Sequence, residues 1–345
     1  MLVDSSAPTR IDLAGGTFDI WPLYLFHPGA QTVNAALSLR ARCRLAARAD
    51  RWIGIHSHDA GCQREAADAG SLAESPDLRL IALLAAHFGA RGVTIETRSE
   101  SPVGAGIAGS SAMGIAVAAA LARWTGRDLD EDALMRVVMD VEAQTIGVPT
   151  GYQDYRPAVY GGVMAVELGV GAVRRVELDC DLPALNSRLV LAHTGASRNS
   201  GVNNWEVTKR HLDGDQHVRR AFDEIAAIAS ETRKAIEAGD WTTLARLLDR
   251  EWEARKRLAP RVTTPEIDEM ASTARRAGAR AAKLCGAGGG GCLVCLADPG
   301  DAPAVRAALT AAGARVLAAG IDLEGLLVSE GQSEEPQPRP TGRRE

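Results

Sequence analysis

The alternation of apolar and polar positions divides the chain into a first part that mixes strands with helices and a later part rich in helices. Short apolar or alternating runs predict strands at residues 7–13, 33–37, 43–58, 92–97, 160–167 and 187–195. Apolar residues at helical spacing predict helices at residues 78–88, 109–126 and 128–142. Gly147, Pro149 and Gly151 break the pattern after the last of these helices, so an irregular loop is expected there.

The later part of the chain carries a different pattern. Charged residues recur at helical spacing through residues 203–258, which predicts solvated amphipathic helices, and we assign them no chemistry. Residues 179–186 are interpreted as a crossing between two domains. From residue 330 the chain is polar and rich in proline, which predicts a disordered tail.

Composition narrows the class of protein. A chain of 345 residues exceeds one ordinary core, so two domains are expected, and 46% hydrophobic residues suffice for a well-buried protein. The net charge of -5, without a basic stripe that carries aromatic residues, argues against nucleic acid as a partner. Residues 1–6 have neither a basic start nor an apolar run, and the six cysteines lie in apolar segments, so we expect a cytoplasmic protein with reduced thiols.

The most informative stretch is residues 102–111, a glycine-rich loop that opens the helix predicted at 109–126. Gly104, Gly106 and Gly109 allow the backbone to approach a ligand closely. Ser110 and Ser111 stand where the first N–H groups of the helix have no internal partner. Such a helix start attracts phosphate, and a phosphate-binding loop is the prediction.

Other interpretations of this loop fit less well. The spacing Gly104-x-Gly106-x-x-Gly109 matches the dinucleotide-binding fingerprint, but no strand follows the helix to carry a ribose-binding carboxylate. The spacing also matches Walker A, but Ser110 stands where the phosphate-binding lysine belongs. Residues 101–122 carry no charge, yet they lack the Leu, Ile and Phe content of a membrane span. Packing of a buried helix is the remaining alternative.

Three further segments carry candidate chemistry. Arg10 and Asp12 interrupt an apolar strand that ends in a double-glycine turn, where a surface pair is the plain alternative. Asp154 lies on the irregular loop, a favourable place for a catalytic carboxylate. Residues 286–291 contain five glycines, which indicates close backbone contact or a mobile loop. The pair Cys292 and Cys295 lies in an apolar run and is interpreted as part of a buried strand.

Taken in order, three of these motifs resemble those of the GHMP small-molecule kinases. They are Arg-Ile-Asp-Leu-Ala-Gly-Gly at residues 10–16, the glycine and serine loop at 102–112, and Gly-Ala-Gly-Gly-Gly-Gly at 286–291. The resemblance covers roughly residues 5–328, and the motifs around Asp154 and at 193–198 look most like the bacterial heptose kinases and fucokinases. One departure is Ala108, where the family motif has glycine; alanine fits there only if the backbone needs no positive φ.

The resemblance implies roles for individual residues. It implies that Asp154 is the catalytic aspartate, that Arg10 pairs with it, and that Glu142 holds Mg²⁺ together with Ser111 or Ser110. It implies that ATP is bound by the loop residues Gly104, Gly106, Ile107, Ala108, Gly109, Ser110, Ser111 and Ala112. The acceptor substrate is expected at Asp19, Thr17, Gly16, Gly151, Arg198, Gly288 and Gly289. Hydroxyl and carboxylate oxygens are ligands that suit Mg²⁺.

The resemblance also implies the fold and the activity. We expect an α+β two-domain protein, with a ribosomal-S5-like domain at 1–183, a ferredoxin-like domain at 184–329 and a tail at 330–345. We expect an ATP-dependent kinase for a sugar or sugar phosphate, most closely a heptose 7-phosphate phosphorylated at its anomeric hydroxyl. Its partners would be small molecules, without nucleic acid or membrane, and a homodimer is left open. A catalytically silent ATP and sugar sensor and an NAD-dependent oxidoreductase are the alternatives.

Overall fold

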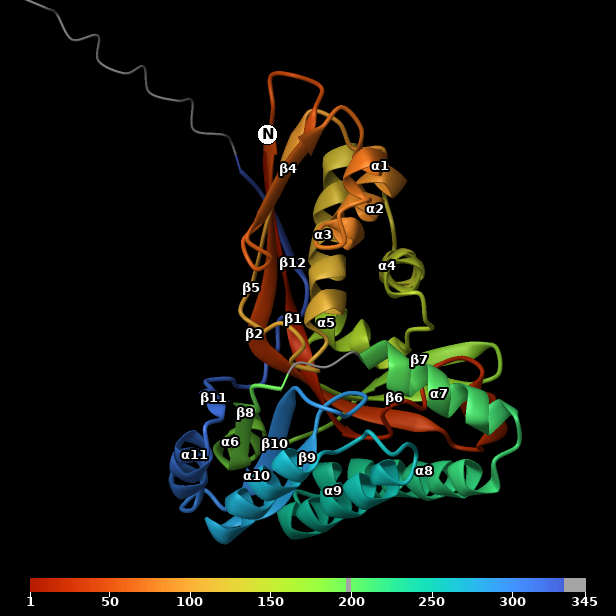
Figure 1. The fold of residues 1–345 in the computed structure, drawn as a ribbon, viewed down its shortest axis with the longest axis vertical. Helices are drawn as coiled ribbons and strands as arrows, with labels where there is room; N and C mark the ends of the chain where they lie inside the picture. The colour runs from red at the N-terminus through yellow and green to blue at the C-terminus, as the bar shows by residue number, and fades with distance from the viewer. Residues whose placement is uncertain (197–199, 332–345) are drawn as a thin grey trace, which may run out of the picture.

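A computed structural model describes residues 1–196 and 200–331 as an α+β protein built on two sheets (Figure 1). The elements follow in the order β1 (Leu2–Ala14), η1 (Leu23–Phe26), β2 (Gln31–Ala47), β3 (Ile53–Ser57), β4 (Cys62–Ala66), α1 (Ala69–Leu72), α2 (Arg79–Phe88), β5 (Val93–Ser99), α3 (Gly109–Thr125), α4 (Glu131–Ile146), η2 (Tyr152–Asp154), α5 (Arg156–Tyr160), β6 (Val163–Gly169), β7 (Ala172–Glu177), α6 (Leu182–Arg188), β8 (Leu189–His193), α7 (Ser200–Leu212), α8 (Gln216–Glu237), α9 (Trp241–Lys256), α10 (Pro265–Arg276), β9 (Ala279–Leu284), β10 (Cys292–Ala297), α11 (Ala302–Ala311), β11 (Arg315–Leu317) and β12 (Leu327–Gly331).

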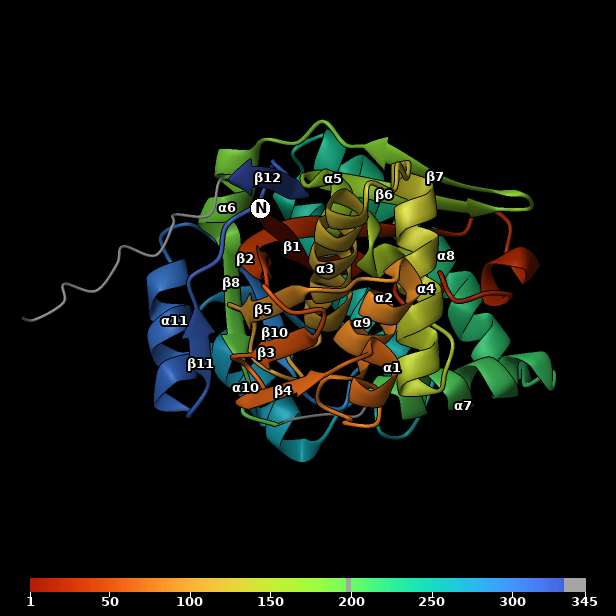
Figure 2. The ribbon, with the colours of Figure 1, turned by 90° about the horizontal axis from the view of Figure 1, so that it is seen from above.

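The first sheet is organised around the long antiparallel pair β1 and β2. Its strand order is β12-β1-β2-β5-β3-β4, with β5 on the second half of β2 and β6, followed by β7, on the first half. Because the two strands have 13 and 17 residues, they run through both halves of the molecule (Figure 1). Helix α3, rich in small apolar residues, packs on β1 and β2 and is covered by α2 and α4 (Figure 2). This packing positions the start of α3 beside β1.

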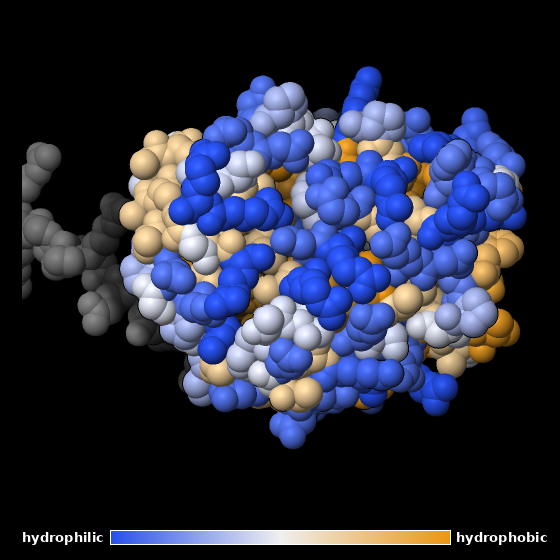
Figure 3. Space-filling view, turned by 90° about the horizontal axis from the view of Figure 1, so that it is seen from below, coloured by the Kyte–Doolittle hydropathy of each residue, from blue (hydrophilic) through white to orange (hydrophobic). Residues whose placement is uncertain are grey.

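The second sheet is antiparallel, in the order β11-β8-β10-β9, and helices α9, α10 and α11 pack on it. Helix α8 packs on α9 and on strands β1 and β2. A shared hydrophobic cluster joins the second sheet to the first sheet, with Ile11 and Leu37 among residues such as Leu191 and Val294. The underside of the molecule, where α8 to α10 lie, is mostly hydrophilic (Figure 3). The shared hydrophobic cluster therefore fixes the second sheet against the first.

The structure confirms most predicted elements and corrects three. The helix expected at 109–126 is α3, and Cys292 and Cys295 lie in the buried strand β10. Residues 31–47 form one strand rather than two, and the expected crossing at 179–186 includes helix α6. Glu330 and Gly331 belong to β12, which pairs with β1, although the sequence predicts them in a disordered tail.

Residues 332–345 lie outside the described residues, so the tail prediction is otherwise untested, and the domain boundaries remain predictions. Within residues 1–196 and 200–331 no helix is long and apolar enough to cross a membrane.

Candidate active site

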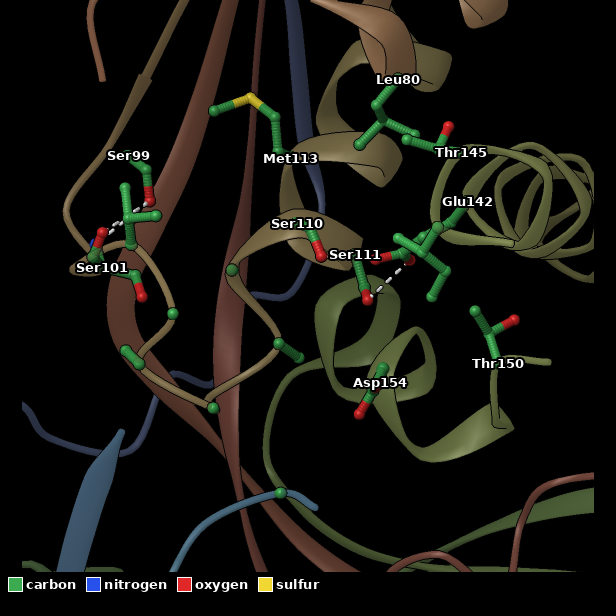
Figure 4. Close-up of a pocket in the computed structure, with 18 of the residues that line it drawn as sticks. Leu80, Ser99, Ser101, Ser110, Ser111, Met113, Glu142, Thr145, Thr150 and Asp154 are labelled. Carbon is green, nitrogen blue, oxygen red and sulfur yellow. Dashed lines mark hydrogen bonds between the residues drawn. The ribbon is translucent and has the colours of Figure 1, made fainter. Parts of the chain in front are cut away.

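The glycine-rich loop lies at the mouth of a cavity of about 580 Å³ that is lined from both halves of the molecule. Gly104 and Gly106 have φ values of +70° and +73°, which a side chain would strain. The backbone N–H of Arg10 donates to the carbonyl oxygen of Ile107 at 3.0 Å, and that of Cys292 donates to Ala105 at 2.7 Å. Strands β1 and β10 thus hold the loop, and the start of α3 opens into the cavity (Figure 4).

Ala108 has φ +60° and ψ +38°, so this position does demand the left-handed conformation. The condition under which alanine replaces the family's glycine without strain is therefore not met. The left-handed region costs an L-residue roughly 1–2 kcal/mol. Ala108 lines the cavity, and strained backbone is typical of functional sites.

Ser110, Ser111 and Glu142 meet at the start of α3, as the resemblance implies (Figure 4). Neither serine caps the helix. The Ser111 hydroxyl donates to Oε2 of Glu142 at 2.8 Å, and the Ser110 hydroxyl donates to Oε1. A third hydroxyl, that of Tyr155, donates to Oε2 at 2.6 Å, a contact that the sequence analysis missed. Burial raises the pKa of Glu142, and the three hydroxyl donors oppose that effect.

Arg10 and Asp154 form an ion pair at the floor of the same cavity. The Nε atom of Arg10 donates to Oδ1 of Asp154 at 2.9 Å, and its Nη2 group donates to the same oxygen. Its Nη1 group donates to the carbonyl oxygen of Gly106 at 3.0 Å, so one side chain joins the carboxylate to the glycine-rich loop. Burial opposes the charge of Arg10, but Asp154 and Asp12 outweigh burial and raise the pKa of Arg10. The Asp154 side chain is 27% exposed and faces the cavity.

Asp19 lies directly behind the loop that carries Asp154. Its Oδ2 atom accepts a hydrogen bond from the backbone N–H of Gln153 at 2.8 Å, while Oδ1 is buried without a partner among the described residues. Gly151 allows this approach, because a Cβ atom there would lie 2.0 Å from Oδ2 of Asp19. Burial, reinforced by the charge of Asp154, raises the pKa of Asp19 to about 7.

Thr17 is a second strained position at the cavity. It is β-branched and 6% exposed, yet its φ is +73°, a conformation that such residues rarely adopt. Its hydroxyl lies 3.5 Å from the side-chain oxygen of Asn204 on α7, and both residues line the cavity. The turn that follows β1 and helix α7 therefore meet at the expected acceptor side of the site.

A buried ionic cluster lies beneath this cavity, and the sequence analysis missed most of it. Asp12, Glu251, Arg255 and Lys283 have side chains at most 2% exposed. Lys283 lies 3.2 Å from Asp12 and 2.8 Å from Glu251, and Arg255 lies 2.9 Å from Glu251. Burial would raise the pKa of Asp12, but Lys283, Arg255 and Arg10 hold it well below its ordinary value. The cluster joins β1 to α9 and β9.

The late glycine-rich segment is held by this cluster and by close backbone contacts. The N–H of Gly286 donates to Oδ1 of Asp12 at 2.7 Å, and the Arg255 guanidinium donates to the carbonyl oxygen of Gly286. At Gly291 a Cβ atom would lie 2.5 Å from the carbonyl oxygen of Ala105. These glycines let the segment lie against the glycine-rich loop at residues 102–111.

The structure brings most of the expected site residues to one cavity. Those that line it are Arg10, Thr17, Gly104, Gly106, Ala108, Gly109, Ser110, Ser111, Glu142, Gly151 and Asp154. Others lie outside its lining, namely Gly16, Asp19, Ile107, Ala112, Gly288 and Gly289. Gly286 and Ala287 take the place expected for Gly288 and Gly289. Arg198 lies outside the described residues.

Comparison with known proteins identifies the class. The model of the GHMP kinases N terminal domain matches residues 78–162, and that of the GHMP kinases C terminal matches residues 232–315. The chain belongs to the GHMP kinase family and is a small-molecule kinase of this ATP-dependent class. This assignment excludes the NAD-dependent oxidoreductase.

Several relatives resemble the chain over most of its length. The D-glycero-alpha-D-manno-heptose 7-phosphate kinase of Campylobacter jejuni is 27% identical over 307 residues, which cover 86% of this chain and 90% of that protein. The mevalonate kinase of Thermococcus gammatolerans is 30% identical over 251 residues, 70% of each chain. The solved structure of a D-glycero-D-manno-heptose 1-phosphate kinase from Bacteriodes thetaiotaomicron has a TM-score of 0.79 at 25% identity and covers 96% of this chain and 100% of its own.

Proposed function

We propose that this chain transfers the γ-phosphoryl group of ATP to a hydroxyl of a sugar phosphate, with a heptose 7-phosphate as the preferred acceptor. The observation that carries the proposal is the Arg10 side chain, which bonds both Asp154 and the Gly106 carbonyl of the phosphate-binding loop. A carboxylate beside a phosphate-binding helix start is the arrangement that direct phosphoryl transfer requires. The heptose kinase relatives support the substrate class.

In this proposal Asp154 is the base. The acceptor hydroxyl gives its proton to the Asp154 carboxylate while its oxygen bonds to the γ-phosphorus, and the bond from that phosphorus to the bridging oxygen of ADP breaks. Arg10 orients Asp154, because two of its N–H groups donate to Oδ1 of that carboxylate. The backbone N–H groups at the start of α3 bind the phosphates.

The residues present also fit a magnesium ion. The hydroxyls of Ser110 and Ser111 and the carboxylate of Glu142 are hard oxygen donors that converge on one side of the loop. These residues would hold Mg²⁺, which supplies charge neutralisation for the ATP phosphates when bound. Thr17, which lines the cavity, is proposed to contact the acceptor, and Arg198 is proposed for the phosphate that the acceptor already carries. The contact expected of Asp19 is not carried into this proposal, because Asp19 is 1% exposed and lies outside the lining.

The test is an ADP-release assay over a panel of acceptors. The panel contains heptose 7-phosphate, heptose 1-phosphate, fucose, galactose, mannose, uronic acids and mevalonate. The highest kcat/KM is expected with heptose 7-phosphate. A preference for mevalonate or for a free sugar would contradict the proposed acceptor, and ATP binding without turnover on any acceptor would favour the catalytically silent sensor.

A further inference from the structure

Tyr155 lies between the proposed base and the proposed metal ligand. It directly follows Asp154 in the chain, and it is 1% exposed. Its hydroxyl donates to Oε2 of Glu142 at 2.6 Å, within the range of a charge-assisted hydrogen bond. Ser111 donates to the same oxygen at 2.8 Å. Two hydroxyls from different elements therefore fix this one oxygen.

A carboxylate in this position needs such donors. Glu142 is 4% exposed, and no Lys or Arg forms an ion pair with it among the described residues. Without a cation beside it, this buried carboxylate is oriented by its hydroxyl donors. Tyr155 is the one of these donors that does not belong to the start of α3.

We propose that Tyr155 is a positioning residue for the metal: its hydroxyl orients the Glu142 carboxylate toward the divalent cation that accompanies ATP. The inference rests on the proposed function, in which Glu142 is a metal ligand. Ser110 and Ser111 are on the same helix start as the phosphate-binding loop, whereas Tyr155 lies between η2 and α5, at the N-cap position of α5. Tyr155 thus couples the orientation of the metal ligand to the segment that carries Asp154.

The experiment measures binding of Mn²⁺ by isothermal titration calorimetry in the presence of ADP, between pH 6 and 8. Tyr155→Phe removes one oxygen and is expected to weaken Mn²⁺ binding about tenfold, the loss of one hydrogen bond to a charged group. At saturating Mg²⁺, kcat is expected to fall less than the affinity for the metal.

Two variants make the outcomes distinct. Tyr160→Phe is the matched control, because Tyr160 ends the helix α5 that Tyr155 precedes, and its ring lies under Arg175 rather than at Glu142. It should bind Mn²⁺ as the wild type does. Unchanged binding in Tyr155→Phe, together with weakened binding in Glu142→Gln, would overturn the inference and leave the proposed function standing. Unchanged binding in both would contradict the proposed metal site itself.

A second measurement avoids any change at Tyr155. Mn²⁺ should perturb the ultraviolet absorbance of tyrosine in the wild type, because the metal draws charge from the carboxylate that Tyr155 contacts. The perturbation should be absent from Glu142→Gln at metal saturation and retained in Tyr160→Phe. Absence of the perturbation in the saturated wild type would also overturn the inference.

Discussion

Arg10 and Asp12 lie two residues apart on one face of β1, yet they belong to groups of charges with different tasks. Arg10 pairs with Asp154, whose side chain is 27% exposed and faces the cavity. Asp12 pairs with Lys283, and both side chains are fully buried. A carboxylate that the solvent and a substrate can reach is able to exchange a proton. A carboxylate enclosed among cations can only hold the elements that carry those cations.

The difference between the two groups concerns access and not chemistry, because both contain carboxylates beside cations. Removing one partner of a buried ion pair leaves an uncompensated charge and costs about 3–5 kcal/mol. Removing the proton acceptor of a base costs turnover instead, about 100-fold or more. This distinction would be contradicted by a variant of the buried cluster that loses only activity. It would also be contradicted by a variant of the Arg10–Asp154 pair that loses only stability.

The largest effect is expected from Lys283→Met, which keeps most of the volume and removes the cation between Asp12 and Glu251. The free energy of unfolding, measured by denaturant titration, should fall by about 3–5 kcal/mol. Lys256→Met is the matched control, because its ammonium pairs with the exposed Glu253 on the same helix and should contribute about 0–1 kcal/mol. Equal losses in the two variants would contradict a special role for the buried cluster.

Asp19 sharpens the comparison, because it is a buried carboxyl without an ion-pair partner among the described residues. In the unfolded chain it ionises near its ordinary pKa of 3.8, whereas in the folded chain its pKa is about 7. The unfolded state binds fewer protons in this window, so the free energy of unfolding should fall as the pH rises through it. The difference between the two pKa values corresponds to a fall of roughly 4 kcal/mol in the free energy of unfolding across this pH range.

The measurement is the unfolding free energy of wild type and Asp19→Asn at several pH values. Relative to the wild type, the free energy of unfolding of Asp19→Asn should increase between pH 4 and pH 7. The control Asp140→Asn, at an exposed position, should show no such increase. A constant difference between wild type and Asp19→Asn across this range would show that Asp19 is already ionised when the chain is folded.

For the cavity pair, Asp154→Asn keeps the size of the side chain and removes the proton acceptor. We expect kcat to fall about 100-fold or more, with little change in ATP binding or in the unfolding midpoint. Turnover is measured by steady-state ADP release with the best acceptor. ATP binding is measured separately, from the thermal shift of the protein as ATP is titrated. Lost stability with near-normal turnover in the folded fraction would mean that Asp154 is only the structural partner of Arg10.

The residues that line the cavity could largely be predicted from the sequence, whereas most of the buried ionic cluster could not. The glycine-rich loop and the irregular loop of Asp154 could be predicted from local residue patterns, whereas the roles of Asp154 and Glu142 are implied only by the resemblance to the GHMP kinases. Glu251 and Arg255 lie on a helix with many charged residues, which resembles a solvated face. Their positions in the helix indicate burial, because Leu244, Glu251 and Arg255 share one face of α9. Only the packing of α9 against β1 shows that Arg255 pairs with Asp12.

Ala108→Gly has the smallest expected effect, and it tests whether strain in the phosphate-binding loop serves a purpose. Glycine relieves a left-handed conformation that costs roughly 1–2 kcal/mol, and it increases the entropy of the unfolded chain by roughly 0.5–1 kcal/mol. The free energy of unfolding should therefore rise by up to about 1 kcal/mol, with the KM for ATP nearly unchanged. Ala105→Gly is the control in the same loop, because Ala105 has no positive φ and should lose stability. A stabilised Ala108→Gly with a raised KM for ATP would mean instead that the alanine restrains the loop in the conformation that binds phosphate.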